Sequence, residues 1–468
     1  LVIIGGKFLN KIITITAIFI ISIFAITAVS AADNSTDDVI AVEDASNEIA
    51  IVNNTGTFTD LSNEIDAIED GGVLNITKDY IYESGSKDGI IINKTITING
   101  NNHKIDGNGQ SRIFSTFNGN ITLNNLVLVN GYHETGGAIY AHKNITLNDV
   151  VFENNRASKY GGAIYAETCF NVNNCIFDAN FAPEGGAIYI KSRPRENYFI
   201  HGPDLDDDFN DTNETTNYTY DGDDNENITQ DNETTNETGP LYFIIENSIF
   251  KNSNNMTRAI LYCGEDQRLM VSNSQFMDST ATYATAIYAT YAKVNCTNTK
   301  FTNLYASKTA GAIIFTESCG GRIENCSFVN VSSFNNAGCI YSDVNGWSRG
   351  VAEPLFITDS EFINSRSRYG GAIVHLGDAL YLYNSKFINN SAVYSGGAIY
   401  VSDAFHKDVI DFSSGDYRKV CAFKIENTTF INNKLDSMDD LSNGGAICAH
   451  KSILNISDSK FILADRKS

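Results

Sequence analysis

Short segments in which apolar and polar residues alternate recur along most of the chain. One of them reads Ile145-Thr-Leu-Asn-Asp-Val-Val-Phe-Glu-Asn-Asn155, and similar segments close on Phe387-Ile-Asn-Asn390 and Phe430-Ile-Asn-Asn433. A period of two residues is typical of β-strands, and no convincing amphipathic helix is found between Asn75 and the last residue. The pattern therefore predicts many short strands, each ending at a Phe that is followed by Asn.

A second phrase, Gly-Gly-Ala-Ile-Tyr in its fullest form, returns at a nearly fixed interval. Its Ile residues are mostly 24 to 27 positions apart, as from Ile139 to Ile164 and from Ile164 to Ile188. A fixed period of this length indicates one supersecondary unit that stacks on copies of itself. The full and partial copies begin at Gly136, Gly161, Gly185, Arg258, Ala284, Ala310, Ala337, Gly370, Gly396 and Gly444.

Such strands cannot bury a face alone, so successive coils must stack. The sequence predicts an all-β fold, a right-handed parallel β-helix (β-solenoid) with about one coil per 24–27 residues. We expect Ile139 to point inward and stack on Ile164, and Phe152 to stack on Phe177. Proline is nearly absent, with five in the chain, as expected where strands pair on both edges.

The punctuating residues of each repeat have specific expected roles. Gly136 and Gly137 lack side chains, which permits tight turns and close approach of neighbouring coils. The Asn after each Phe is expected at a corner with left-handed backbone geometry, where stacked copies can form a hydrogen-bonded ladder. These corner residues are Asn155, Asn180, Asn390 and Asn433.

The N-terminal region differs from the repeats. Residues 1–32 resemble a secretory signal peptide, with Lys7 and Lys11 before an apolar run and small residues at Ala28–Ala32; a retained signal anchor is the alternative. Residues 33–57 are a polar leader. Residues 58–72 are a possible capping helix that would close the open end of the solenoid. Its apolar face would hold Leu61, Ile65 and Ile68, and its cap would be Thr59 or Asp60.

The β-helix repeats are expected to fill residues 73–468, with three insertions. Residues 203–240 hold thirteen Asp or Glu and no Lys or Arg, which predicts a solvated, disordered loop. Smaller insertions are expected at 345–353 and 405–419; such loops project from one flank and often supply a binding surface. The strand phrase at Ser457–Phe461 continues without its Asn, so we expect the chain to be part of a longer protein.

Composition limits the partners and the chemistry of the cysteines. A net charge of −23 argues against nucleic acid or an anionic membrane as the partner. The nine Cys include two spacings that would allow local disulfides, Cys169 with Cys175 and Cys319 with Cys326; the alternative is that they act as small buried hydrophobes. Asn-x-Ser/Thr sequons are numerous, and those of the acidic insertion are plausible glycan sites, from Asn210 to Asn236.

Candidate chemistry is sparse. His142-Lys143 and His450-Lys451 occupy the same place after their glycine phrases, with no acidic partner recurring beside them, so repeat inheritance explains them. The runs 204–208 and 221–224 resemble calcium ligands only loosely. One group of charged residues could serve a β-helix lyase or hydrolase, near the only Trp, Trp347: Asp343, Arg349, Glu353 and Asp378. We assign no catalytic, cofactor-binding or metal-binding residue.

The paired GGAI and FxxN phrases resemble the polymorphic outer-membrane protein repeats of chlamydial surface adhesins. The stretch Thr95–Gly107 and the Asn- and Thr-rich copies resemble more closely the adhesin-like proteins of methanogenic archaea. The resemblance implies an exported β-helix protein without shared catalytic residues. It covers residues from about Val73 to Phe461.

Three functions follow as hypotheses. The first is a secreted or cell-surface adhesin-like solenoid, without catalysis or cofactor, that binds a glycan or protein on another cell. The second is a polysaccharide lyase or glycoside hydrolase of β-helix type. The third is a structural stalk for a distal domain. Charged and aromatic residues gathered on one outer strand face would favour binding or catalysis, whereas a uniform Asn/Ser/Thr exterior would favour the stalk.

Overall fold

The computed structural model describes most of the repeat region. The described residues are 55–192, 241–264, 267–316, 319–344, 354–377, 379–402, four short strands between 405 and 421, 423–436 and 443–463. Several predicted features lie outside them: the signal peptide, nearly all of the polar leader, the insertions at 203–240 and 345–353 and the sequons from Asn210 to Asn236.

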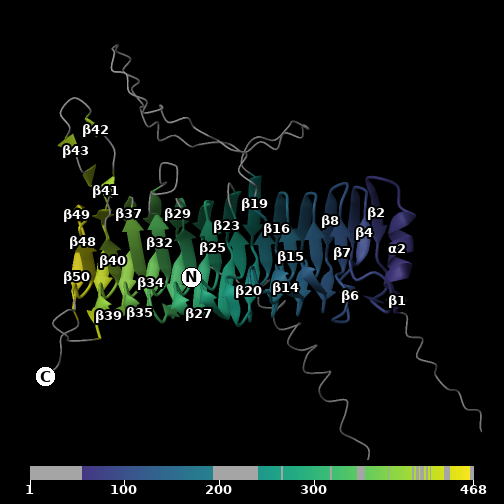
Figure 1. Cartoon of the computed structure of the whole chain (residues 1–468), viewed down its shortest axis with the longest axis horizontal. Helices are drawn as coiled ribbons and strands as arrows, with labels where there is room; N and C mark the ends of the chain where they lie inside the picture. Colours follow the sequence, from purple (N-terminus) through teal and green to yellow (C-terminus); the bar gives the residue numbers. More distant parts are fainter. Residues whose placement is uncertain are drawn as a thin grey trace, which may run out of the picture. The chain divides into compact units, whose positions relative to one another are not determined.

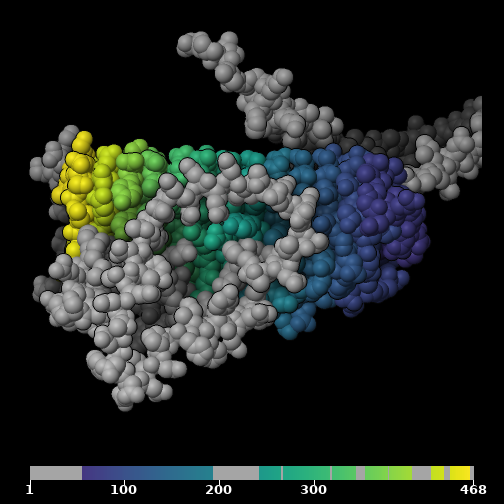
Figure 2. Space-filling view, turned by 90° about the horizontal axis from the view of Figure 1, so that it is seen from above, coloured from purple at the N-terminus to yellow at the C-terminus, as the bar shows by residue number. Residues whose placement is uncertain are grey.

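The described chain is a parallel β-solenoid, as predicted, and its coils follow one another along one axis from α2 to β50 (Figures 1 and 2). Each coil contributes in turn to three sheets, here named I, II and III. Sheet I has 12 strands and sheet II has 13. Sheet III has 19, because several coils add a second short strand to it.

Sheet I carries the Ala-Ile step of each repeat. Its strands are β4 (Ile90–Ile92), β7 (Phe114–Thr116), β11 (Ile139–Ala141), β15 (Ile164–Ala166), β18 (Ile188–Ile190), β22 (Leu261–Cys263), β25 (Ile287–Thr290), β28 (Ile313–Thr316), β32 (Ile340–Val344), β36 (Ile373–Gly377), β40 (Ile399–Ser402) and β48 (Ile447–His450).

Sheet II follows in each coil. Its strands are β2 (Gly72–Asn75), β5 (Ile96–Asn99), β8 (Ile121–Asn124), β12 (Ile145–Asn148), β16 (Phe170–Asn173), β19 (Leu241–Glu246), β23 (Gln267–Ser272), β26 (Lys293–Thr297), β29 (Gly320–Glu324), β33 (Leu355–Thr358), β37 (Leu380–Tyr383), β45 (Phe423–Glu426) and β49 (Leu454–Ser457).

β10 (Tyr132–Thr135) and β14 (Arg156–Tyr160) form a separate two-stranded sheet. Sheet III carries the Phe of each repeat. Its strands are β1 (Gly56–Thr57), β3 (Tyr80–Ile81), β6 (Lys104–Asp106), β9 (Val127–Val129), β13 (Val151–Glu153), β17 (Ile176–Asp178), β20 (Ile249–Lys251), β21 (Met256–Arg258), β24 (Gln275–Tyr283), β27 (Lys300–Thr309), β30 (Ser327–Val329), β31 (Ser332–Ser333), β34 (Glu361–Ile363), β35 (Arg366–Tyr369), β38 (Lys386–Ile388), β39 (Ser391–Ser395), β46 (Thr429–Ile431), β47 (Lys434–Leu435) and β50 (Lys460–Ile462).

The stacking predicted from the repeat is confirmed. Ile139 pairs with Ile164, and Phe152 pairs with Phe177, whose ring lies parallel to it at 4.6 Å between centroids. Alternate residues of each strand point inward, so every coil adds its Ile and Phe to one continuous core. The Phe stack comprises Phe152, Phe177, Phe250, Phe276, Phe301, Phe328, Phe362, Phe387, Phe430 and Phe461.

The asparagine corners differ from the prediction by one residue. The left-handed position is taken by the residue before the predicted one, as at Asn154 with φ 56° and Asn389 with φ 55°. Asn155 instead turns inward, is fully buried, and donates through Nδ2 to Asn180 Oδ1 at 3.1 Å and to the Leu128 carbonyl oxygen at 2.9 Å. Two ladders therefore exist. The buried one lies inside the solenoid, where each amide satisfies backbone groups of neighbouring coils. The predicted ladder at the left-handed corner also forms, on the outside, as where Asn389 Nδ2 donates to Asn364 Oδ1 at 3.3 Å.

Asn390 offers a direct test of this buried ladder. Its Oδ1 accepts from the Ser365 N–H at 2.9 Å, and its Nδ2 donates to the Phe362 carbonyl oxygen at 3.0 Å. Asn390→Ala leaves those groups buried and unpaired, so we expect a loss of about 2–3 kcal/mol in the free energy of unfolding by urea. Ser279 fills the same ladder position and accepts from Ser253 N–H at 3.1 Å. Asn390→Ser should therefore cost clearly less than Asn390→Ala; an equal cost would contradict the hydrogen-bond explanation.

Helix α2 (Phe58–Asp66) lies at the N-terminal end of the stack (Figure 1) and buries Phe58, Leu61 and Ile65. The helix is shorter than the capping helix predicted over residues 58–72. Its cap is Thr57, and the prediction of Thr59 or Asp60 is wrong. Asp60 is the third helical residue, and it completes a capping box with Thr57.

The other end of α2 is held by a lysine of the solenoid. Lys94 Nζ donates to the carbonyl oxygens of Ile65, Asp66 and Ile68 at 3.1, 3.1 and 2.7 Å. The last carbonyls of a helix need partners beyond the helical ladder, and a cation there also suits the helix dipole. The lysine thereby ties the helix to the second coil.

All three insertions leave the solenoid at the same corner, between a strand of sheet I and the next strand of sheet II. They separate β18 from β19, β32 from β33, and β40 from β45. The third contains two antiparallel pairs, β41 (Phe405–His406) with β44 (Val420–Cys421) and β42 (Ile410–Asp411) with β43 (Asp416–Tyr417). The strands that flank the three insertions thus occupy equivalent places in their coils, and the projection of the insertions from one flank stays a prediction.

The described cysteines, all except Cys421, form no disulfide bond. The disulfide alternatives Cys169–Cys175 and Cys319–Cys326 are therefore wrong, and the interpretation as small buried residues holds for most of them. Burial raises the pKa of the Cys175 and Cys326 thiols to about 12, which makes both unreactive at neutral pH. Both stand in a stacked position filled elsewhere by serine, and their N–H groups donate to Ser248 Oγ and Ser360 Oγ, each at 3.1 Å.

Candidate binding face

Of the candidate catalytic group, only Asp343 lies within the described residues. Asp343 lies on β32, pairs in register with Thr316 and Leu376, and accepts a hydrogen bond from Tyr341 Oη at 3.1 Å. Arg349, Glu353, Asp378 and Trp347 lie outside the described residues, so their grouping stays a prediction. The calcium-like runs 204–208 and 221–224 also lie outside them.

A row of tyrosines on the outer side of sheet I is the most distinctive outward surface. In the phrase Ala-Ile-Tyr-Ala, Ile139 and Ala141 point into the core, so Tyr140 between them must point outward. Exact register then places each following copy directly beside it. The tyrosine row comprises Tyr140, Tyr165, Tyr189, Tyr262, Tyr288, Tyr341 and Tyr400, with Ile314 and Val374 in the two other places.

The rings of the tyrosine row stack on each other. Tyr140 and Tyr165 are parallel with centroids 5.5 Å apart, as are Tyr165 and Tyr189, and Tyr189 lies 4.5 Å from Tyr262. Burial raises the pKa of Tyr140 and Tyr165 to about 12, with the nearby Glu167 carboxylate adding to the shift. The row is therefore a rigid, uncharged strip of ring edges and phenol hydroxyls, already ordered before any ligand arrives.

A second row of polar and aromatic side chains lies alongside, on the strands that lead into each glycine phrase. Tyr160 packs against Tyr189 with ring centroids 4.6 Å apart. In the next coils the same place holds Glu184 and then Arg258, which are joined by an ion pair of 2.7 Å. The Arg258 guanidinium lies 5.1 Å from the Tyr288 ring centroid.

A charged cluster lies at the corner beside the row. Glu167 accepts hydrogen bonds from Tyr140 Oη at 2.9 Å and Lys191 Nζ at 2.6 Å, and its other oxygen lies 2.6 Å from His142 Nδ1. Burial favours a raised pKa for this carboxyl, but these three partners outweigh it, so the pKa is lowered and Glu167 is ionised at neutral pH. His142 therefore has an acidic partner, which stands one coil further on, although no acid recurs in the sequence beside both His-Lys pairs.

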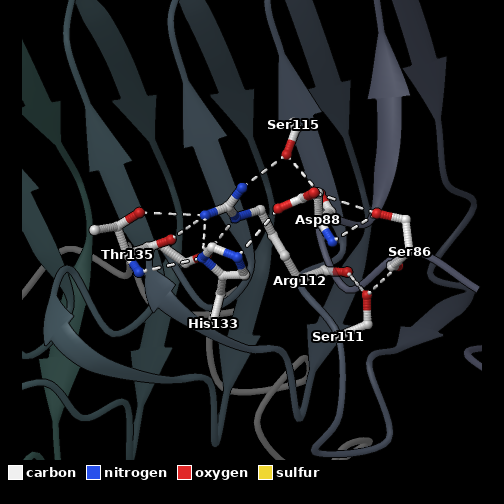
Figure 3. A network of polar contacts seen from close by, with 8 residues as sticks. Ser86, Asp88, Ser111, Arg112, Ser115, His133 and Thr135 are labelled. Atoms are coloured by element: carbon white, nitrogen blue, oxygen red, sulfur yellow. Dashed lines mark hydrogen bonds and ion pairs between the residues drawn. The ribbon is translucent and has the colours of Figure 1, made fainter.

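A buried arginine, Arg112, lies beside the first tyrosine of the row. Figure 3 shows its polar contacts. Arg112 donates through Nε to the Gly136 carbonyl oxygen at 3.0 Å and through Nη1 to Ser115 Oγ at 2.9 Å. Its Cζ lies 5.0 Å from the Tyr140 ring centroid. The donors of Arg112 are thus used inside the protein, and the residue acts as a fixed support for the first tyrosine.

His133 completes this network between Arg112 and Asp88 (Figure 3). Since Arg112 Nη2 can only donate, His133 Nδ1 accepts, which leaves the proton on Nε2, 3.2 Å from Asp88 Oδ1. Burial and the Arg112 charge lower the pKa of His133, so the imidazole is neutral at pH 7. None of these residues was singled out by the sequence, because they belong to coils before the first full glycine phrase.

The described residues contain no cluster of three or more His, Cys, Asp or Glu that could hold a metal ion. Nor do they include a helix long and apolar enough to cross a membrane. What the tyrosine row can do is bind: phenol hydroxyls both donate and accept hydrogen bonds, and ring surfaces pack against apolar C–H groups. A strip of this kind suits an extended, hydroxylated ligand.

Comparison with known proteins identifies the type of repeat, but it does not identify an activity. Residues 149–167 and 384–402 match the Chlamydia polymorphic membrane protein (Chlamydia_PMP) repeat. Each match runs from a Phe of sheet III to a glycine phrase of sheet I, the two phrases on which the predicted resemblance was based. No curated protein matches the chain.

The solved structures that match include one titled "a new PL6 alginate lyase complex with trisaccharide". It is 12% identical to this chain, with 87% of this chain and 84% of that chain covered and a TM-score of 0.30. So low a score supports no conclusion about activity. The chain therefore carries two repeats of the chlamydial membrane-protein type within a parallel β-solenoid.

Proposed function

We propose that the protein is a cell-surface or secreted adhesin-like solenoid that binds a glycan of another surface along its tyrosine row, without cleaving it. The observation that carries the proposal is the row itself. An exterior that served only as a stalk would need no aromatic residues, yet this strip repeats tyrosine on coil after coil in register. The matches to a surface-protein repeat support the same reading.

The chemistry of the row explains why a glycan is the expected ligand. The hydroxyls of Tyr165, Tyr189 and Tyr288 form no hydrogen bond with other described residues, so they are available to sugar hydroxyls. Successive coils lie about 4.8 Å apart, so Tyr165 and Tyr189 are one such step apart and Tyr288 lies two steps beyond Tyr189, a spacing that an extended polymer can follow. The ionised Glu167 with its partners and the Glu184–Arg258 ion pair lie at the edge of the strip.

Retention and release measured together test this function. The purified full chain is applied to immobilised plant, mucin and microbial-wall polysaccharides, and new reducing or unsaturated sugar ends are assayed in the same wells. We expect retention on at least one polymer without new ends. Release of new ends from any polymer would overturn the non-catalytic proposal and direct attention to Asp343, Glu353 and Asp378.

Substitution in the row should weaken retention without loss of the fold. Ser115 occupies the same place in the coil before Tyr140, so serine is compatible with this position. Tyr165→Ser with Tyr189→Ser should reduce retention about tenfold or more, since each aromatic contact contributes about 0.5–1.5 kcal/mol beyond its buried area. The matched control is Tyr305→Ser on sheet III, where the ring is 42% exposed. Equal retention by all three proteins would exclude the row as the binding face.

A further inference from the structure

A second outward strip, on sheet II, has a different chemistry. Arg268 on β23 pairs in register with Lys293 on β26, and Arg322 stands two residues further along the next strand, β29. Each alternates with an inward residue, as Arg322 does beside the buried Ile323. Three successive coils thus present cations on one face of a chain whose net charge is −23.

Two of these cations are held on aromatic rings and not on carboxylates. Arg268 Cζ lies 5.5 Å from the Tyr242 ring centroid, and its Nη1 donates to Tyr242 Oη at 3.2 Å. Arg322 Cζ lies 4.9 Å from the Phe356 ring centroid. Within the described part of the chain neither arginine forms an ion pair, although Glu324 stands two residues from Arg322 on the same face.

Within the described residues, the absence of an ion pair distinguishes Arg268 and Arg322 from two other arginines of the solenoid. Arg258 is paired with Glu184 at 2.7 Å, and Arg366 with Asp436 at 3.1 Å. An aromatic ring orients a guanidinium through its face while leaving the N–H edge free to donate. Arg268 and Arg322 therefore present donor edges of fixed orientation, two coils apart, or about 10 Å along the axis.

Aromatic residues continue the same strip toward the C-terminus. Phe356 pairs in register with Tyr381, and their rings stack with centroids 5.1 Å apart. On the next coil Lys424 Nζ lies 5.3 Å from the Tyr383 ring centroid and 2.9 Å from Glu426 Oε2. The strip thus joins two arginines that form no ion pair with other described residues to ring surfaces on adjacent coils.

We infer that this cation–aromatic strip, from Tyr242 to Tyr381 on the outer face of sheet II, binds an anionic polysaccharide that lies along the solenoid axis. Carboxylate or sulfate groups of the polymer would accept bidentate hydrogen bonds from Arg268 and Arg322. The sugar rings between the charged groups would pack on Phe356 and Tyr381. The site is separate from the tyrosine row, since it lies on another sheet, and it does not depend on that row being a binding face.

The test measures retention of the full chain on dextran sulfate and on polygalacturonate, with uncharged dextran as the reference matrix. We expect retention on at least one polyanion, weakening as salt is raised because the contacts are exposed and ionic. Arg268→Gln with Arg322→Gln should weaken that retention at least about tenfold, the loss of one or two charge-assisted hydrogen bonds. Arg366→Gln is the matched control, because it removes one charge from an ion-paired arginine.

The outcomes separate this site from the proposed function. Polyanion retention that survives Tyr165→Ser with Tyr189→Ser but is lost in the double arginine variant assigns the polymer to sheet II. No retention of the unaltered chain on either polyanion, or retention unchanged in the double arginine variant, would overturn the inference. Equal retention on uncharged dextran would also overturn it, since binding would then owe nothing to charge.

Discussion

Replacing Gly371 by alanine is expected to destabilise the solenoid by roughly 3 kcal/mol or more. A Cβ at this position would lie 2.0 Å from the Gly397 carbonyl oxygen and 2.7 Å from the Ser391 carbonyl oxygen. Both contacts are with backbone of the next coil, which cannot move without breaking its own ladder. The loss would appear as a lower urea midpoint, followed by far-UV circular dichroism.

Gly445 provides the control for this substitution. It is the second glycine of the last phrase, in the same repeat position as Gly371, but an added Cβ there would meet nothing within 4 Å. Gly445→Ala should therefore leave the midpoint nearly unchanged. Similar losses for Gly371→Ala and Gly445→Ala would mean that backbone flexibility, and not the approach of the next coil, explains the glycine.

Truncation of a ring in the middle of the phenylalanine stack should be almost as costly. Phe328 is fully buried between Phe301 and Phe362, with centroids 4.5 and 4.7 Å away. Phe328→Ala removes both contacts and leaves a cavity that the flanking coils cannot fill, so a loss of about 3–5 kcal/mol is expected. Because each coil contacts only its neighbours, the unfolding transition should also broaden.

The same stack contains its own control. Phe461 lies on β50, is 51% exposed, and contacts one neighbour, Phe430, at 4.8 Å. Phe461→Ala should cost clearly less than Phe328→Ala in the same urea experiment. If the two variants were equally destabilised, coil-on-coil stacking would not be the source of the stability.

The repeat phrases predicted the stacking of the core because identical residues at a fixed period can only lie side by side in a solenoid. Ile139 on Ile164 and Phe152 on Phe177 follow from that alone. The corner asparagines needed finer information. Asn154 and Asn155 are adjacent and chemically identical, and only the path of the turn decides which takes positive φ and which turns inward.

The tyrosine row could have been predicted from the sequence, but it was missed. Tyrosine is the fifth letter of the repeated phrase, and strand alternation alone sends it outward from between two buried residues. The contact between His142 and Glu167 could also have been predicted, because Glu167 lies one repeat period further along the chain. The sheet II strip was not, because Arg268 and Arg322 follow loops of unequal length and share no repeated phrase. Their alignment depends on the register of β23, β26 and β29.

Tyrosine footprinting by mass spectrometry tests the central claim most directly. The full chain is labelled at exposed tyrosines with and without the polysaccharide that retains it. The tyrosine row predicts protection at Tyr165, Tyr189 and Tyr288, no change at the exposed Tyr305, and no new sugar ends during the incubation. Protection confined to other tyrosines, or cleavage of the polymer, would contradict a solenoid that binds along the outer side of sheet I.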